Sequence, residues 1–308
     1  EEHAHWLALA RHIARLTRRT TLCIDLTPER IGRAANGPTF TLADLLAGRI
    51  RAGATTPEGA RHDRVTTGGL TAVRGIGAAD EATAAERDLP ALLGRLRDDY
   101  HYTVVLLPPG HPLLTTNLLT YATRVLVVGA VGEMPQLRAT LADLPMPPSA
   151  ELFPDLNAVI VGAPPGMNLS VAVQDILAPA LGVPVRGLIP ADPARQPPAL
   201  AAVARWLVGQ RIGWVLGAGG ARGFAHIGAI AALRRARLPV DCSSGSSVGG
   251  IIAAGISGQM TIPYIEAALT GGAYRVFRPT IPIKGILTSR ALATWFQRPD
   301  VYGQVLIE

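Results

Sequence analysis

The chain has 308 residues, of which 48% are hydrophobic and 17% charged, and its formal net charge is +6 at pH 7. This length is sufficient for two domains, and the composition is that of a globular protein. Lys284 is the only lysine, so the positive charge comes almost entirely from arginine. Aromatic residues make up 5% and no stripe alternates basic with aromatic side chains, which argues against nucleic-acid binding.

The number of cysteines and the N-terminal sequence indicate where in the cell the protein is located. Cys23 and Cys242 are too few for a disulfide framework, and both fall in strands predicted to be buried. The first residues lack the layout of a signal peptide, and no apolar run reaches the roughly 18 residues of a membrane span. These features predict a cytoplasmic location, with peripheral attachment to a membrane left open.

Short apolar runs alternate with helical periodicity along residues 1–210. Such alternation predicts a parallel, doubly wound α/β domain. Gly68-Gly69 between two short runs is typical of a hairpin, and Pro90 predicts a break in a helix. The predicted helices cover residues 6–16, 41–47, 79–99, 133–144, 170–181 and 198–208, and the predicted strands cover 21–26, 65–67, 70–74, 102–107, 124–130, 157–162 and 184–189.

Residues 212–258 carry the main functional signal. Their pattern predicts a strand at 212–216 buried on both faces, a glycine turn, a helix, a second strand, a tight turn and another helix. The tight turn has the form G-x-S-x-G, with Gly245, Ser247 and Gly249. In this motif a serine on a strained strand-to-helix turn projects its hydroxyl clear of the sheet, and the helix N-terminus favours developing negative charge. The alternative is an ordinary Ser/Gly loop.

The earlier glycine turn, residues 217–223, leaves backbone N–H groups uncovered by side chains, as an oxyanion hole requires. A dinucleotide-binding turn is a rival interpretation, because Asp241 follows at roughly the expected distance. Arg222 stands where that motif needs its third glycine, and Asp241 precedes its strand instead of ending it. These two departures disfavour the rival.

The segments GAGGARGFAHIGAIAAL and PVDCSSGSSVGGIIAAGISG together resemble the patatin-like phospholipases, in particular the neuropathy-target-esterase branch. The resemblance implies a Ser–Asp dyad, a phospholipid or lysophospholipid substrate, and no cofactor or metal. Ala218 replaces a family glycine and would be strained if that position needed a positive φ. The implied roles are nucleophile for Ser247, oxyanion hole for Gly219, Gly220, Ala221 and Arg222, and nucleophile elbow for Gly245 and Gly249.

The catalytic aspartate of that family lies in an Asp-Gly motif downstream of the serine, but no Asp-Gly dipeptide occurs here. Asp241 precedes the serine and Asp300 is followed by Val301, so neither matches. The sequence also ends within an apolar pattern, at Ile307-Glu308. We therefore expect a C-terminally truncated domain that lacks a complete dyad.

Residues 1–210 resemble the MinD/ParA-type ATPases more weakly, through LCIDL, TLADLLAG, YHYTVVLLPPG, RVLVVGA and LGVPVRGLIPADP in that order. No lysine is available for a phosphate-binding loop, and Leu106 and Leu107 replace the acid and its neighbour before Pro-Pro-Gly. Asp25 alone does not supply these parts. The resemblance implies a degenerate domain with a structural or regulatory role and an unknown regulatory ligand.

Two further features leave alternatives open. His226 is either a general base of a Ser-His-Asp triad or a helix residue packed below the glycine turn, and the two-residue dyad of the family favours the second. Residues 260–297 are apolar and form either core helices or a surface facing acyl chains or a membrane.

The fold class expected is therefore α/β, with two doubly wound three-layer α/β/α domains in tandem, at 1–210 and 211–308. Two functions compete. The first is a serine lipid-acyl hydrolase. The second is a catalytically inactive regulatory or scaffold protein whose first domain binds a nucleotide or a partner.

Overall fold

The computed structural model divides the chain into two compact units: residues 1–167 with 177–210, and residues 168–176 with 211–308. Each unit is described by itself below. The structure describes residues 2–26, 40–41, 70–74, 87–89, 91–94, 96–107, 112–145, 155–164, 171–258, 260–271, 278–279 and 287–288.

Two parallel sheets form the framework of the first unit, so the protein is α/β with parallel sheets, as predicted. One sheet has the strand order β2-β3-β1-β4 and the other β5-β6-β7. The strands are β1 (Thr21–Asp25), β2 (Phe40–Thr41), β3 (Leu70–Arg74), β4 (Tyr102–Leu106), β5 (Arg124–Ala130), β6 (Asp155–Ala163) and β7 (Val185–Pro190).

A hairpin was predicted around Gly68-Gly69, but these glycines and the first arm at 65–67 lie outside the described residues. Within the described residues β3 lies parallel to both β1 and β2. The predicted helix at 41–47 also lies largely outside the described residues. Residues 87–89 and 91–94 are helical, but Pro90 is not described, so the predicted break stays a prediction.

The helices of the first 210 residues include one that the sequence analysis missed. This helix, α4, starts at Pro112, and proline is favoured at the first helical position because it has no N–H to satisfy there. The helices are α1 (Glu2–Thr17), α4 (Pro112–Leu119), α5 (Met134–Ala142), α6 (Val171–Leu181) and α7 (Gln196–Leu207).

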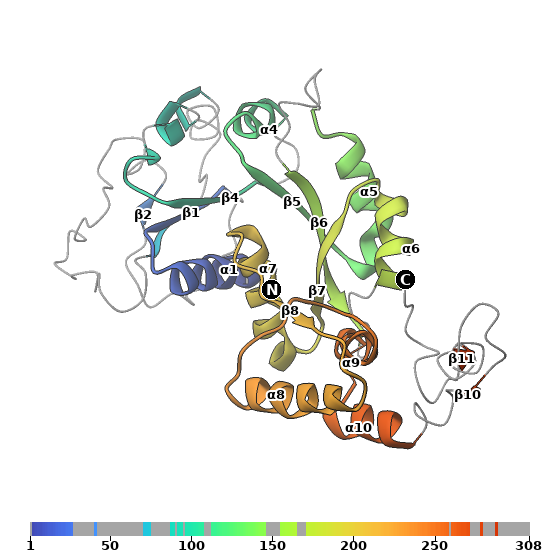
Figure 1. Ribbon diagram of the computed structural model, residues 1–308. Coiled ribbons are helices and arrows are strands. Elements are labelled where there is room, and N and C mark those ends of the chain that lie inside the picture. The colour runs from blue at the N-terminus through green and yellow to red at the C-terminus, as the bar shows by residue number, and fades with distance from the viewer. Residues whose placement is uncertain are drawn as a thin grey trace. The chain divides into compact units, whose positions relative to one another are not determined.

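Helices α1 and α7 pack against β6 and β7, with α5 on the other side of that sheet (Figure 1). Gly187 permits close approach of α7, because a Cβ there would lie 2.5 Å from Val203 Cγ2. The core of this layer joins Leu9 and Ile13 of α1, Val159 and Val161 of β6, Ile189 of β7, and Leu200, Val203 and Ala204 of α7.

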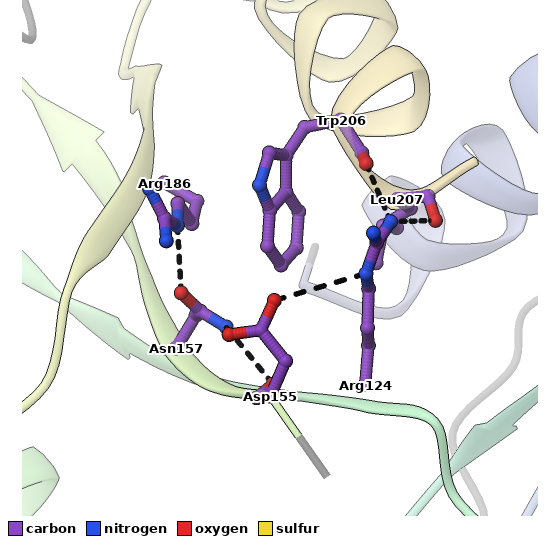
Figure 2. A network of polar contacts seen from close by, with 6 residues as sticks. All are labelled: Arg124, Asp155, Asn157, Arg186, Trp206 and Leu207. Carbon is purple, nitrogen blue, oxygen red and sulfur yellow. Dashed lines mark hydrogen bonds and ion pairs between the residues drawn. The ribbon is translucent and has the colours of Figure 1, made fainter. Parts of the chain in front are cut away.

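A polar network ties the last turn of α7 to the starts of the strands (Figure 2). Arg124, at the start of β5, donates Nη1–H to the carbonyls of Trp206 (2.6 Å) and Leu207. Its Nε lies 3.8 Å from Asp155 Oδ2. The last carbonyls of a helix have no partner within it and carry partial negative charge, so a guanidinium stabilises this end.

The same network satisfies the buried side chain of Asn157. Asn157 is 0% exposed and receives Arg186 Nε–H on its Oδ1 at 2.7 Å, while its Nδ2 donates to Asp155 O and Oδ1, both at 2.9 Å. The guanidinium carbons of Arg124 and Arg186 lie 4.9 and 5.3 Å from the Trp206 ring centroid (Figure 2). The polar groups of this network therefore bond mainly to one another, as expected of a network that stabilises the fold.

The second unit has the element order predicted for residues 212–258. Its strands β8 (Gly213–Leu216) and β9 (Cys242–Gly245) are parallel, and Leu216 pairs with Gly245 at their carboxyl ends. The helices are α8 (Phe224–Arg235), α9 (Val248–Ser257) and α10 (Ile262–Gly271), and two short strands, β10 (Arg278–Pro279) and β11 (Leu287–Thr288), pair antiparallel. The apolar core of the unit includes Trp214, Leu216, Ile227, Ile230, Ile252 and Ile265.

Two burial predictions for this unit are wrong. The strand at 212–216 was expected to be buried on both faces, yet Trp214 and Leu216 are buried while Val215 is 83% exposed. Cys242 on β9 is likewise exposed, whereas Cys23 is buried as expected. Helices α8 and α9 cover one face of the β8–β9 pair, and the other face is not covered within the described residues.

Candidate active site

Ser247 occupies the turn between β9 and α9 with φ 54° and ψ −128°, a backbone conformation that residues with a Cβ rarely adopt. Holding a non-glycine residue in such a region costs about 1–3 kcal/mol. The hydroxyl makes no hydrogen bond with any described residue, and Ser247 is exposed at the N-terminus of α9. This is the geometry of a nucleophile elbow.

The two glycines of the elbow are explained by how closely the backbone segments approach. A Cβ on Gly245 would lie 2.3 Å from Gly249 O, and a Cβ on Gly249 would lie 2.3 Å from Leu216 O and 2.5 Å from Gly217 O. These neighbours are backbone atoms that cannot rotate away. Glycine is therefore required at both positions for the turn to close onto the end of β8.

Backbone hydrogen bonds hold the elbow in place. Ser246 donates its N–H to Leu216 O at 3.0 Å, and Gly249 donates to Ser246 O at 3.0 Å. Because Leu216 is also the last paired residue of β8, the elbow and the glycine turn begin at the same edge of the sheet. In parallel α/β sheets the carboxyl ends of the strands are where ligands bind.

The glycine turn runs from Gly217 into a short 3₁₀ helix, Gly220–Gly223. Gly220 has φ +51°, which glycine adopts without penalty. Arg222 donates its N–H to Gly219 O at 3.0 Å, so that amide is engaged within the turn. The N–H groups of Gly219, Gly220 and Ala221 make no hydrogen bond within the described residues, and all three residues are exposed. Three of the four predicted oxyanion positions therefore present unengaged donors.

Two further details of this turn concern Ala218 and Arg222. Ala218 does not have a positive φ, so replacing the family glycine causes no backbone strain there. The guanidinium of Arg222 makes no hydrogen bond or ion pair with a described residue, so the backbone and not the arginine side chain closes the turn.

The turn and the elbow pack directly on each other through a contact that the sequence did not signal. Gly223 is buried, and a Cβ there would lie 2.1 Å from Val248 Cγ1. Val248 follows the nucleophile immediately, and it is buried. The residue after such a serine commonly supplies an oxyanion N–H, which makes Val248 a candidate that sequence reasoning missed. Only the strand-turn-helix context of the motif could have indicated it.

Neither His226 nor Asp241 is placed as a base for Ser247. His226 Nε2 lies 3.0 Å from Gly217 O, so this nitrogen is occupied by a backbone carbonyl. Asp241 Oδ2 accepts the N–H of Ile212 at 2.9 Å, ahead of β8. This backbone contact also argues against a ribose-binding role for Asp241, because the carboxylate lies at the amino ends of the strands.

The described part of the chain contains neither a candidate metal site nor a candidate membrane-spanning helix. No three His, Cys, Asp or Glu side chains lie close enough together there to hold a metal ion. No described helix combines the length and apolarity needed to cross a bilayer.

A strained serine directly after a parallel strand, on a helix start that packs against a turn with unengaged amides, is the kind of arrangement found in serine esterases with a nucleophile elbow. Residues 214–299 match the family model of the patatin-like phospholipases, and this part of the chain is a patatin-like phospholipase domain.

Curated relatives match the same region. The chain is 51% identical over 75 residues to lysophospholipase NTE1 of Cryptococcus neoformans, covering 22% of this chain and 5% of that protein. It is 34% identical over 113 residues to neuropathy target esterase sws of Drosophila melanogaster, covering 34% of this chain and 8% of that protein. The chain therefore spans less than a tenth of the length of these relatives.

Solved structures resemble the chain over a wider range. The cell division ATPase MinD of Pyrococcus furiosus aligns with 67% of this chain and 93% of its own, at 16% identity and a TM-score of 0.46. Cobyrinic acid a,c-diamide synthase of Mycobacterium smegmatis, with bound ATP analogue and magnesium, aligns with 67% of this chain and 91% of its own, at 22% identity and a TM-score of 0.43. Similarity of this degree carries no inference about nucleotide binding.

Proposed function

We propose that the protein is a serine lipid-acyl hydrolase of the phospholipase or lysophospholipase type, with Ser247 as its nucleophile. The observation that carries the proposal is the backbone of Ser247, whose φ of 54° is maintained beside three unengaged amides. An ordinary Ser/Gly loop would not be expected to hold its serine in an unfavourable backbone conformation. Strain of this kind persists where the surrounding structure enforces it, and it is concentrated at functional sites.

In the proposed reaction Ser247 Oγ attacks the ester carbonyl carbon and transfers its proton to a base. The carbonyl oxygen becomes an oxyanion that accepts hydrogen bonds from the amides of the glycine turn, and loss of one such donor typically costs about 3 kcal/mol. The tetrahedral intermediate collapses with cleavage of the ester C–O bond, and the alcohol leaves with a proton. Water then attacks the acyl-serine and releases the fatty acid.

The base is not assigned to a described residue, because no described carboxylate or imidazole is hydrogen-bonded to Ser247. The proposal extends to the architecture: a degenerate first domain at 1–210, and a patatin-like domain beginning at 211, each doubly wound with three layers. A cytoplasmic protein that attaches peripherally to lipid surfaces fits such a substrate.

The proposal is tested by labelling the full-length protein with a fluorophosphonate probe. Oγ displaces fluoride from phosphorus only when the serine is activated, and mass spectrometry identifies the modified peptide. We expect label on Ser247, none in Ser247→Ala, and unchanged label in Ser244→Ala, which removes an exposed hydroxyl from the adjacent strand.

Circular dichroism of each variant confirms that it is folded. Absence of label on folded wild-type protein would overturn the hydrolase and favour the regulatory or scaffold function. Equal label in Ser247→Ala would assign the nucleophile to another serine.

A further inference from the structure

The side chain of His226 contacts the start of the glycine turn. It lies in the first turn of α8, nine residues after Gly217, and its Nε2 is 3.0 Å from Gly217 O. The segment between these residues contains the unengaged amides of Gly219, Gly220 and Ala221. The imidazole therefore closes the turn into a ring that carries the oxyanion donors.

The carbonyl that His226 contacts is also packed against the elbow. Leu216 O and Gly217 O lie 2.3 and 2.5 Å from the position of a Cβ on Gly249. Leu216 O accepts the N–H of Ser246 at 3.0 Å, and Gly217 O is the acceptor beside His226. Two consecutive carbonyls thus fix the elbow and the glycine turn to the same point of β8.

Whether the imidazole acts as a hydrogen-bond donor or as a base depends on which atom it contacts, here Gly217 O. A carbonyl oxygen only accepts hydrogen bonds, so a hydrogen bond at this distance requires the proton to be on Nε2. A nitrogen that donates to a backbone carbonyl has no free lone pair with which to take a proton from Ser247 Oγ. The contact therefore fits a positioning residue and does not fit a general base acting through Nε2.

We propose that His226 is a positioning residue: by donating Nε2–H to Gly217 O it sets the distance between the oxyanion amides and Ser247. This inference rests on the proposed hydrolase function. Because a displacement of about 1 Å at a reacting site can reduce the rate by about a hundredfold, loss of the contact should reduce turnover without weakening substrate binding.

Two nearly isosteric substitutions test this role in the full-length protein. The amide nitrogen of His226→Gln takes the place of Nε2 and retains the donor, whereas that of His226→Asn takes the place of Nδ1 and does not reach Gly217 O. With a p-nitrophenyl fatty-acid ester as substrate, we expect kcat of His226→Asn to fall by about tenfold to a hundredfold with KM unchanged. We expect His226→Gln to stay within a few-fold of wild type.

The other possible results of these assays distinguish a failure of the His226 role from a failure of the proposed hydrolase function. If wild-type protein neither labels at Ser247 nor hydrolyses the ester, the proposed function fails. If wild type is active and both variants lose all activity, His226 is a base, because glutamine cannot take the proton. If both variants match wild type, or if His226→Asn raises KM alone, the positioning role is overturned.

Discussion

Strand ends meet helix ends in two regions of the molecule: the glycine turn with its elbow, and the Arg124 network. The polar groups of the Arg124 network are hydrogen-bonded, whereas several of those in the glycine turn are not, within the described residues. In the Arg124 network the carbonyls at the end of α7 receive a guanidinium, and the fully buried Asn157 has hydrogen bonds on both sides of its amide. In the elbow the serine is strained and three neighbouring amides are left without partners in the described residues.

This contrast distinguishes stability from function within one chain. A polar network that satisfies its members contributes to folding, and nothing in it remains available to a ligand. The strained backbone of Ser247 reduces stability, and it persists because the packing of Gly245, Gly249 and Gly223 enforces it. The two regions should therefore respond in opposite ways to mutation.

The largest effect is expected when the packing that enforces the elbow is disturbed. Gly249→Ala places a methyl group 2.3 Å from Leu216 O, a backbone atom, so β8 or α9 must shift. We expect a loss of about 3 kcal/mol in the free energy of unfolding, together with loss of fluorophosphonate labelling. Urea unfolding followed by circular dichroism measures the first quantity.

Gly228→Ala is the matched control, because it lies in α8 and a Cβ there meets nothing within 4 Å. Alanine favours a helix over glycine by about 1 kcal/mol, so this variant should be as stable as wild type or more so. Equal stability of Gly249→Ala and Gly228→Ala would contradict the close approach of the elbow to β8.

A smaller effect, confined to stability, is expected in the Arg124 network. Arg124→Ala removes the charged donor from the carbonyls of Trp206 and Leu207 and one guanidinium from the Trp206 ring, while Gly209 N–H still donates to Trp206 O at 3.1 Å. Hydrogen bonds to a charged group contribute about 1.5–3 kcal/mol, so we expect a loss of about 2 kcal/mol with unchanged labelling of Ser247.

The exposed pair Arg87–Asp88 provides the comparison for this variant. Arg87→Ala removes a surface ion pair, and such pairs contribute little to stability, so its urea midpoint should match that of wild type. A similar midpoint for Arg124→Ala would mean that the network does not stabilise α7.

The sequence predicted the order of elements in both regions because hydrophobic periodicity and glycine positions are local properties. Ser247, Gly245 and Gly249 were proposed from the G-x-S-x-G spacing together with the family resemblance, and the glycine turn from its lack of side chains. The network was not foreseen, since Arg124, Asn157 and Trp206 are far apart in sequence and have no motif in common. The exposure of Val215 was also missed, because an apolar run does not reveal whether both faces of its strand are covered.

The contact of Val248 with Gly223 was also not predictable, because it joins residues that are distant in sequence. Glycine at 223 belonged to a recognisable turn, but the side chain it accommodates comes from a helix 25 residues later. In sequence, His226 could be a base or a packed helix residue, and the two-residue dyad of the resembled family favoured the second. The 3.0 Å contact of His226 with Gly217 O provides the tertiary information that distinguishes them.

The smallest and most specific effect is a gain of stability when Ser247 is replaced by glycine. Ser247→Gly keeps the turn but removes the Cβ that makes φ 54° unfavourable, whereas Ser247→Ala removes only the hydroxyl and keeps the strain. We expect the free energy of unfolding of Ser247→Gly to exceed that of Ser247→Ala by about 1 kcal/mol, because relief of such strain outweighs the extra entropy of an unfolded glycine. Both variants should be unlabelled. If Ser247→Gly proved less stable than Ser247→Ala, the elbow would not be storing strain, and the contrast between an enforced functional turn and a satisfied structural network would fail at its central residue.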